Sequence, residues 1–413
     1  MLRLGGAVTH TQQILEGLEV LVGDKNFANM LQLKSLQPFD ESVIIFFDEL
    51  SKLLMADSSN RAYPDIVTFA FFCRRGNLRK LQRDYPDRLT NRLGRGISFH
   101  IAPSNIPINF AYSFLMGLLS GNVCIIRVSS KKFTQIEIIC NAINNLLTLS
   151  QLKGVGKYIS IIRYSHDLEI NNFFSSLCDV RIIWGGDETI SNIRNSPLSP
   201  RAFDITFANR YSICTINAAS YNEIEDKAQI AGHFYNDTYL FDQNACSSPS
   251  LIYWVGEESV ISEAKAIFWS ELYKYLLIRG YDISPITSIN KRIFLCQAAI
   301  KILGSIVHEG KDSLIHRIEL SDLPNDLLGY KCFAGTFLEF SSVSLNDLYP
   351  IITKEFQTLT YIGYSKGVIV KNLIDKGVKG IDRVVPVGRA ADFGIVWDGF
   401  NLILQMSREI YAD

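Results

Sequence analysis

The sequence predicts an α/β protein with two domains, each built around a sheet of mainly parallel strands, preceded by a helical segment. Two observations predict this fold class. From about residue 96 onward, short β-rich runs alternate with amphipathic helical segments, which is typical of βαβ units. The chain of 413 residues is also longer than one hydrophobic core normally grows, so more than one domain is expected.

The composition excludes several classes of protein. Hydrophobic residues make up 47% of the chain and charged residues 20%, which is ordinary for a globular protein and too apolar for a disordered one. The 41 Lys and Arg residues nearly balance the 42 Asp and Glu residues, so no net positive field would attract nucleic acid. Gly, Ser and Asn interrupt the apolar stretch of residues 110–128, and we expect a buried helix and strand there, not a membrane span.

The N-terminus and the cysteines both indicate a cytoplasmic protein. Gly, Thr, His and Gln occur early in the chain, so the uninterrupted apolar core of a signal peptide is absent. The eight cysteines are widely spread, and no two of them form a C-x-x-C motif. We therefore expect reduced thiols, with neither a disulfide framework nor a metal site.

Four segments follow one another along the chain. Residues 1–95 carry apolar side chains at helical spacing and should form a helical N-terminal segment. Residues 96–220 are expected to form a nucleotide-binding type of domain, and residues 221–370 a second α/β domain. Residues 371–413 are expected to return to the first domain or to contribute to an oligomer interface.

The period of the apolar residues assigns the individual elements. The expected strands are residues 97–102, 121–128, 158–163, 180–184, 202–217, 250–255, 335–343 and 358–363. The expected helices are residues 111–119, 134–147, 169–177, 188–195, 221–235, 257–277 and 345–354.

Two common phosphate-binding motifs are absent from the sequence. Residues 304–312 contain the glycines and lysine of a P-loop, but the spacing is wrong and Asp312 replaces the hydroxyl residue that would hold magnesium. No G-x-G-x-x-G sequence follows a predicted strand. A dinucleotide would therefore bind without the usual glycine fingerprint.

Two polar turns follow predicted strands in the first domain, at the edge where parallel sheets bind ligands. In the first turn, two prolines stiffen a loop that presents Asn105, whose amide could donate to an oxyanion or could cap the following helix. The second turn gathers two hydroxyls and basic side chains, which suit an anionic ligand or a solvated turn: Arg127, Ser129, Ser130 and Lys131.

Two further turns contain small residues. Gly185 and Gly186 follow a predicted strand and would let a cofactor approach the backbone, although Asp187 and Glu188 also suit a helix N-terminus without a ligand. Cys246 lies in a turn of polar and small residues ahead of a predicted strand, whereas most other cysteines lie in apolar runs. This setting makes Cys246 the best candidate nucleophile, and the alternative is a small buried cysteine.

Taken together, these motifs resemble the aldehyde dehydrogenase superfamily and, within it, the acyl-CoA reductase family of bacterial bioluminescence operons, the LuxC type. The similarity spans roughly residues 95–413. It rests on dispersed motifs in one order: residues 100–107 (HIAPSNIP), 121–130 (GNVCIIRVSS), 184–188 (WGGDE), 207–212 (FANRYS), 242–246 (DQNAC), 397–399 (WDG) and 407–408 (SR). Several motifs in one order are much more specific than any one of them.

The resemblance implies an aldehyde-dehydrogenase-like fold with two Rossmann-like parallel-sheet domains. It implies that Cys246 is a thioester-forming nucleophile, and that the side chain of Asn105 and the Cys246 backbone N–H form an oxyanion hole. It places six residues along a nicotinamide cofactor: Arg127, Ser129, Ser130, Lys131, Gly185 and Gly186. The hydroxyls and cations after the second strand favour NADPH, because NAD-selective sites usually offer a carboxylate to the ribose 2′-hydroxyl.

The resemblance also bears on water activation. Aldehyde-oxidising relatives carry a Glu in the region of residues 207–212, whereas this chain has Ala208 and Asn209 there. The superfamily's second acidic position falls at Cys332. The missing base suits a reductase, because hydrolysis of the enzyme thioester would waste the acyl group.

We therefore expect NADPH-dependent reduction of an acyl-CoA or acyl-protein thioester, with a fatty acyl group, to the aldehyde. The alternatives are an NAD(P)-dependent aldehyde-oxidising dehydrogenase and a non-redox cysteine acyltransferase. The same similarity implies an acyl-protein synthetase as a partner, and we also expect a homo-oligomer.

Overall fold

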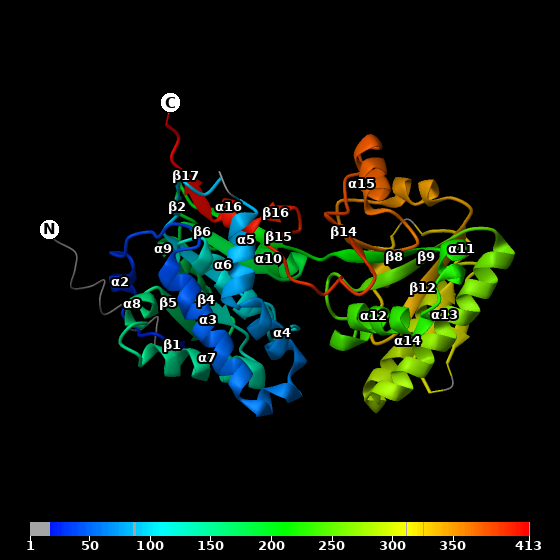
Figure 1. The fold of residues 1–413 in the computed structure, drawn as a ribbon, viewed down its shortest axis with the longest axis horizontal. Helices are drawn as coiled ribbons and strands as arrows, with labels where there is room; N and C mark the ends of the chain where they lie inside the picture. Colours follow the sequence, from blue (N-terminus) through cyan, green and yellow to red (C-terminus); the bar gives the residue numbers. More distant parts are fainter. Residues whose placement is uncertain (1–16, 86–87, 311, 325, 413) are drawn as a thin grey trace. The chain divides into compact units, whose positions relative to one another are not determined.

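The computed structural model describes residues 17–85, 88–310, 312–324 and 326–412 (Figure 1). Two compact units divide the chain: Met1–Ala208 together with Ile395–Asp413, and Asn209–Gly394. Each unit contains a sheet of mainly parallel strands, which confirms the predicted fold class. Within the described residues, no helix is both long and apolar enough to cross a membrane.

The first sheet has the strand order β1-β5-β4-β3-β6-β7. The strands are β1 (Glu19–Val22), β3 (Ile97–Ile101), β4 (Val123–Val128), β5 (Ile159–Arg163), β6 (Val180–Trp184) and β7 (Phe203–Phe207). β3 to β7 pair with one another in parallel, and the edge strand β1 runs antiparallel to β5. The chain builds outward from β3 through β4 to β5 and then returns to the other side of β3 as β6. The strand order therefore reverses between β3 and β6, where open parallel sheets bind ligands.

Helices cover both faces of this sheet. They are α3 (Glu41–Ala56), α4 (Pro64–Phe72), α5 (Arg75–Arg83), α6 (Asn109–Leu119), α7 (Thr134–Leu147), α9 (Leu168–Leu177) and α10 (Asp187–Arg194). On one face, α9 and α10 pack apolar side chains such as Phe174 and Ile190 against Phe99 of β3. On the other face, α3 contacts α6 and α7 (Figure 1). The N-terminal region thus completes the cover of the first sheet.

The C-terminal residues return to the first unit. β17 (Ser407–Glu409) pairs antiparallel with β2 (Arg92–Gly94). The largely buried guanidinium of Arg92 donates to Ser407 Oγ at 2.8 Å and to the backbone carbonyl of Leu404 at 2.7 Å. This pairing fixes the end of the chain beside the segment that precedes β3.

The second sheet has the order β10-β11-β12-β9-β8-β13-β14. Its strands are β8 (Tyr211–Asn217), β9 (Pro249–Val255), β10 (Ile306–Glu309), β11 (His316–Glu319), β12 (Thr336–Ser342), β13 (Phe356–Ile362) and β14 (Arg383–Pro386). Neighbouring strands are parallel except that β10 runs antiparallel to β11. The helices around it are α11 (Ala218–Glu223), α12 (Lys227–Thr238), α13 (Glu258–Arg279), α14 (Pro285–Lys301) and α15 (Lys366–Asp375).

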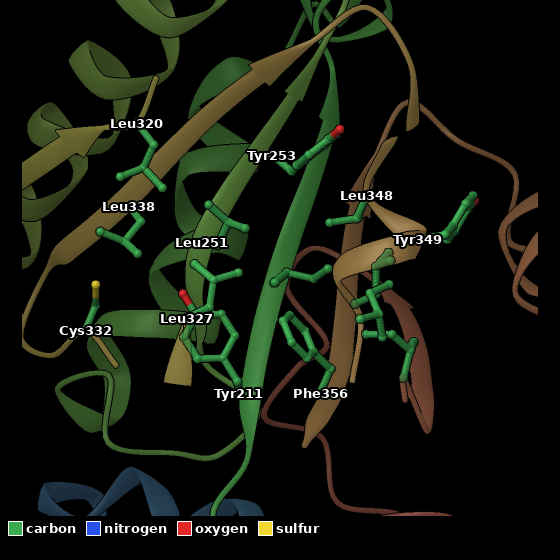
Figure 2. Close-up of a cluster of buried hydrophobic side chains, with 14 of the residues drawn as sticks. Tyr211, Leu251, Tyr253, Leu320, Leu327, Cys332, Leu338, Leu348, Tyr349 and Phe356 are labelled. Carbon is green, nitrogen blue, oxygen red and sulfur yellow. The ribbon is translucent and has the colours of Figure 1, made fainter. Parts of the chain in front are cut away.

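Alternate side chains of β9 enter two separate cores, one on each face of the second sheet. Ile252 and Trp254 pack against Phe268 of α13. Leu251 and Tyr253 point to the opposite face, into the cluster shown in Figure 2. This alternation follows from the two-residue period of a strand. Because both faces are covered, polar side chains that meet solvent must lie at the strand ends.

The unit boundary differs from the one expected from sequence. The single strand region of residues 202–217 is in fact two strands, and the units divide between Ala208 and Asn209, not at residue 220. No Gly or Pro separates β7 from β8, so local sequence carries no sign of the break. Residues 371–394 also stay with the second unit, and the return to the first begins at Ile395.

Two helical predictions also differ from the structure. Residues 221–235 span two helices, α11 and α12, instead of one. Residues 345–354 form two short 3₁₀ segments, in which Pro350 lacks the N–H that a continuing α-helix needs. The pattern also missed α14, which carries apolar side chains on two opposite faces.

Candidate functional site

Three of the predicted turns lie at one edge of the first sheet. The loop of residues 102–108 follows β3, and Gly185 and Gly186 follow β6, its parallel neighbour. The turn after β4 lies at the same edge, because β4 is the other parallel neighbour of β3. The fold therefore brings Asn105, Arg127 and the two glycines to the carboxyl ends of three adjacent strands, where such sheets bind ligands.

Asn105 is exposed in the loop between β3 and α6. The helix-capping alternative is wrong, because α6 begins at Asn109, its N-cap is Ile108, and the described residues form no side-chain capping hydrogen bond there. The side-chain amide of Asn105 therefore does not cap α6.

Arg127 reaches from the end of β4 toward the end of β5. Its guanidinium donates to the backbone carbonyl of Tyr164 at 3.3 Å and lies over the Tyr164 ring, 5.2 Å from the centroid. Burial lowers the pKa of Arg127 below its usual value. Its Nε is buried and finds no hydrogen-bond partner among the described residues.

The turn after Arg127 contains residues of two kinds. Ser129 is buried; its Oγ accepts from the Lys131 N–H at 3.1 Å, and its carbonyl accepts from Arg163 Nε at 3.3 Å. Ser129 therefore shapes the turn, whereas the side chains of Ser130 and Lys131 are exposed. The turn offers a hydroxyl and a cation to a ligand and carries no carboxylate.

The glycine pair joins β6 to α10. The Gly185 N–H donates to the Phe207 carbonyl at 3.2 Å, and a Cβ at Gly185 would lie 3.0 Å from Thr189 Cγ2. Gly186 precedes the helix, and Asp187 and Glu188 occupy its first turn. The close packing of β6 against α10 thus explains why residue 185 is a glycine. The two carboxylates interact favourably with the positive end of the α10 helix dipole.

A buried polar network lies beneath these loops. Trp184 Nε1 donates to Ser113 Oγ at 3.0 Å, His100 Nδ1 lies 2.7 Å from the same oxygen, and His100 Nε2 lies 2.9 Å from Ser98 Oγ. Because the Ser98 hydroxyl donates to the Val123 carbonyl at 3.1 Å, Ser98 Oγ can accept from Nε2, which favours the imidazole proton on Nε2 and lets the Ser113 hydroxyl donate to Nδ1. Burial lowers the pKa of His100 to about 3, so the ring stays neutral and links β3, α6 and β6.

Cys246 lies in the second unit, in the turn between the 3₁₀ segment Tyr239–Phe241 and β9. It is partly exposed, whereas six of the other seven cysteines are buried and Cys296 is exposed. The Ser212 hydroxyl of β8 donates to the Cys246 carbonyl at 2.7 Å, and Ser212 Oγ accepts from the Thr358 N–H at 3.2 Å. The backbone of the nucleophile candidate is thus tied to two neighbouring strands.

Gln243 clamps the same turn from inside. Asp242 and Gln243 adopt left-handed conformations, with φ of 50° and 59°. The buried Gln243 amide donates to the carbonyls of Pro249 and Thr336, each at 2.9 Å, and accepts from the Gly335 N–H at 3.0 Å. These bonds compensate a backbone that L-residues rarely adopt, and they fix the course of the chain three residues before Cys246.

Lys291 supports the clamp from α14. Its buried ammonium donates to the backbone carbonyls of Ser313 and Ala334, and the Ala334 N–H donates to the Asp242 carbonyl at 3.0 Å. Burial lowers the pKa of Lys291 to about 7. The residue therefore acts on the Cys246 turn through the backbone at residue 334, and the sequence analysis missed it.

Cys332 occupies an apolar setting. It is buried in the cluster of Figure 2, and its backbone N–H donates to Ser250 Oγ at 3.2 Å. Burial raises the pKa of its thiol to about 12, so the thiol stays neutral. Among the described residues, no group of three or more His, Cys, Asp or Glu side chains is placed to hold a metal ion.

Sequence reasoning missed Gln243, Ser212 and Lys291 as supports of the turn. Gln243 was visible as part of the DQNAC motif, but its partners lie at residues 249, 335 and 336. No local sequence pattern predicts hydrogen bonds between residues so far apart.

Replacing Gln243 by Ala should lower the free energy of unfolding by about 2–4 kcal/mol, because buried backbone groups of Pro249, Thr336 and Gly335 lose their partner. Hydrogen exchange should accelerate in residues 242–250. Gln229→Ala, at an exposed position of α12, is the matched control and should change neither quantity. Equal stability of the two variants would show that the clamp does not hold the turn.

Known proteins match the chain in sequence and in fold. A family model described as "Acyl-CoA reductase (LuxC)" matches residues 10–409. The long-chain acyl-protein thioester reductase of Aliivibrio fischeri is 28% identical over 242 residues, which cover 56% of this chain and 46% of that protein. Long-chain acyl-protein thioester reductase 2 of Photobacterium leiognathi is 31% identical over 198 residues, which cover 46% of this chain and 38% of that protein. The matched regions thus span less than half the length of either relative.

Solved structures show the same fold at low identity. Lactaldehyde dehydrogenase from Escherichia coli superposes with a TM-score of 0.65 at 11% identity, covering 97% of this chain and 90% of that chain. The glyceraldehyde-3-phosphate dehydrogenase GapN from Methanocaldococcus jannaschii superposes with a TM-score of 0.62 at 12% identity, covering 97% of this chain and 93% of that chain. These likenesses confirm the predicted aldehyde-dehydrogenase-like fold. Because the family model covers almost the whole sequence, the chain belongs to the LuxC acyl-CoA reductase family.

Proposed function

We propose that this protein reduces a fatty acyl thioester, either acyl-CoA or an acyl-protein, to the aldehyde, with NADPH as the reductant and Cys246 as the nucleophile. The observation that carries the proposal is the Cys246 turn. A partly exposed cysteine lies in the turn just ahead of the buried strand β9, with its backbone fixed by Ser212 and Gln243, in a chain of the LuxC family. A fixed backbone presents a nucleophile in one orientation, which is what attack on a carbonyl needs.

The first half-reaction transfers the acyl group to the chain. The Cys246 thiolate attacks the thioester carbonyl carbon, the bond from that carbon to the carrier sulfur breaks, and the carrier thiol leaves with a proton. The Asn105 amide donates to the developing oxyanion, together with the Cys246 backbone N–H. The exposed Asn105 side chain, which does not cap α6, supports this assignment.

The second half-reaction releases the aldehyde. When bound, NADPH supplies the hydride that reduces the acyl carbon, after which the bond to Cys246 sulfur breaks. The chain itself protects the acyl group from water: residues 207–212 contain no carboxylate that could activate a water molecule. This feature favours reduction over the oxidation of an aldehyde to an acid.

We propose that the edge of the first sheet binds a nicotinamide cofactor with a 2′-phosphate. We assign Arg127, Ser129, Ser130, Lys131, Gly185 and Gly186 to this site. The exposed Ser130 and Lys131 offer a hydroxyl and positive charge beside the guanidinium of Arg127, and the turn has no carboxylate to repel a phosphate. Ser129 acts through the shape of the turn.

The relatives' names suggest the carrier and the setting. Because they are called acyl-protein thioester reductases, we propose that an acylated protein can deliver the substrate and that an acyl-protein synthetase is a partner. We place the reaction in the cytoplasm and expect the chain to act as a homo-oligomer.

Incubation with radiolabelled acyl-CoA, without NADPH, should give a hydroxylamine-sensitive adduct that maps to Cys246. Addition of NADPH should convert the label to aldehyde, because hydride reduces the thioester. Cys246→Ser should abolish the thioester, whereas Cys296→Ser, at the exposed cysteine, should not. An adduct on another cysteine would contradict the assignment, and acid without aldehyde would favour the oxidising alternative. Turnover without NADPH binding would favour the acyltransferase alternative.

Asn105→Ala should lower kcat by roughly 100-fold or more, the usual loss for one oxyanion donor, and should leave the melting temperature unchanged, since the side chain caps no helix. Ser104→Ala, at an exposed neighbour in the same loop, should be near normal in both respects. Stopped-flow NADPH oxidation and thermal denaturation measure the two quantities. Normal turnover of Asn105→Ala would refute the role.

Ser130→Glu should weaken NADPH binding by on the order of 1–3 kcal/mol and spare NADH, because the carboxylate would repel a 2′-phosphate. Ser130→Gln has nearly the same size without the charge and should preserve the preference. Fluorescence titration with both cofactors measures the difference. Equal weakening of NADPH and NADH would place the 2′-phosphate elsewhere.

A further inference from the structure

A single buried ammonium joins loops of the second unit. Lys291 of α14 is fully buried, and its Nζ donates to three backbone carbonyls: that of Ser313, that of Leu314 at 3.4 Å and that of Ala334 at 2.6 Å. An ammonium has three N–H donors and no acceptor. Within the described residues, the hydrogen bonds of this ammonium therefore all go to the backbone.

The loops concerned precede neighbouring parallel strands. Residues 313–315 lead into β11, residues 332–335 lead into β12, and residues 242–248 lead into β9. β12 lies between β11 and β9 and is parallel to both, so the three loops lie at the same edge of the second sheet. Cys246 belongs to the third loop. Lys291 thus holds the two loops that lie beside the loop of the candidate nucleophile.

The loop of Cys246 is bonded to the loop ahead of β12. The Ala334 N–H donates to the Asp242 carbonyl at 3.0 Å, and the Gly335 N–H donates to Gln243 Oε1 at 3.0 Å. Cys246 follows Gln243 by three residues. A shift of the backbone at residue 334 would therefore be passed on to the start of the Cys246 turn.

The backbone at this junction adopts conformations that L-residues rarely adopt. Of the seven non-glycine residues with a positive φ in the described chain, four lie here: Asp242 (50°), Gln243 (59°), Ser313 (60°) and Ala334 (47°). Such residues persist only where the surrounding structure holds them. The Lys291 ammonium bonds directly to Ser313 and Ala334, so it holds two of the four.

The charge of Lys291 is not needed for packing. The same face of α14 packs Leu295 and Ala298 into the core of the second unit. An apolar side chain of similar length would fill the position of Lys291 without the cost of burying an ammonium. What the ammonium adds is strength, because hydrogen bonds from a charged donor are about twice as strong as neutral ones.

We propose that Lys291 is a positioning residue for acyl transfer: its charged form holds the loops at the amino ends of β11, β12 and β9 in the arrangement in which Cys246 attacks a thioester. The inference rests on the proposed function, because it takes Cys246 to be the nucleophile. Lys291 touches no substrate in this scheme. It acts through the backbone of Ala334 and Asp242.

The protonation of Lys291 makes this arrangement depend on pH. Burial lowers the pKa of Lys291 to about 7, although Asp312 and Cys332 act in the opposite direction. The ammonium therefore predominates below about pH 7, and the neutral amine predominates above it. The loops should be held most firmly on the acidic side of this value.

Several titratable and charged groups surround the junction. They lie on the helices, strands and loops packed around Lys291: Tyr239, Asp242, Tyr273, Tyr281, Arg292, Glu309, Asp312, His316 and Cys332. Burial lowers the pKa of His316 to about 4 and raises the pKa of Cys332 to about 12, so neither changes its charge near pH 7. Lys291 does change its charge there.

The first experiment compares two reactions of Cys246 in the wild-type chain as the pH rises from about 6 to about 9. One is acylation without NADPH by radiolabelled octanoyl-, dodecanoyl- or palmitoyl-CoA, whichever reacts fastest. The other is alkylation by iodoacetamide, followed at the Cys246 peptide by mass spectrometry. Both reactions need the thiolate, so the ratio of their rates removes the ionisation of Cys246. The ratio should fall as the pH rises through about 7. A ratio that stays level would overturn the proposal.

The second experiment separates the charge of Lys291 from its packing. At about pH 6, Lys291→Met should lower the acylation rate by on the order of 100-fold and change the alkylation rate little, because only acylation needs a fixed approach. Lys291→Arg keeps a charge at every pH, so its ratio should stay level above pH 7. Lys301→Met, at an exposed position of the same helix, is the matched control and should behave as the wild type.

The outcomes distinguish this inference from the proposed function. A wild-type chain that forms no adduct at Cys246 would contradict the proposed function and this inference with it. If the wild type is acylated, equal acylation of Lys291→Met, or an equal loss of acylation and alkylation, would refute the role of Lys291 alone. Circular dichroism shows whether Lys291→Met is folded. Should it not fold, the wild-type ratio and Lys291→Arg decide.

Discussion

Burial of both faces of each parallel sheet is the constraint on which the positions of the candidate functional residues depend. Helices cover the sheets on either side, so groups that must meet a ligand can lie only where strands end. Inside the first sheet, the polar side chain of His100 is neutral and bonded to two serines. At the strand ends, by contrast, Arg127 keeps a buried donor without a partner, and Asn105 is exposed.

The second unit uses buried polar groups to shape a turn. Gln243 holds a left-handed stretch of backbone by three hydrogen bonds, and Lys291 holds the segment ahead of β12 to which that stretch is bonded. Each group would be costly to bury alone, and each is satisfied by backbone atoms. The position of Cys246 is therefore set by side chains that take no part in the chemistry we propose.

Helix α14 combines two roles that are usually separated. Its inner face completes the core and supports the Cys246 turn through Lys291, and its outer face exposes apolar side chains such as Ile293. An apolar pattern on both sides of one helix also explains why its amphipathic signal is weak in the sequence.

The sequence by itself determined the α/β class, most strands of the two sheets and the turn that contains Cys246, because the period of apolar residues and the residues of turns are local signals. Only the tertiary structure decided the rest. It divided one apolar run between β7 and β8, since each strand joins the sheet in which its hydrogen-bond partners lie. It showed that Asn105 caps no helix, and it gave Gln243 partners up to 93 residues away. Hydrogen bonds between residues so far apart, and the burial of their side chains, depend on the folded chain, and neighbouring residues in the sequence do not indicate them.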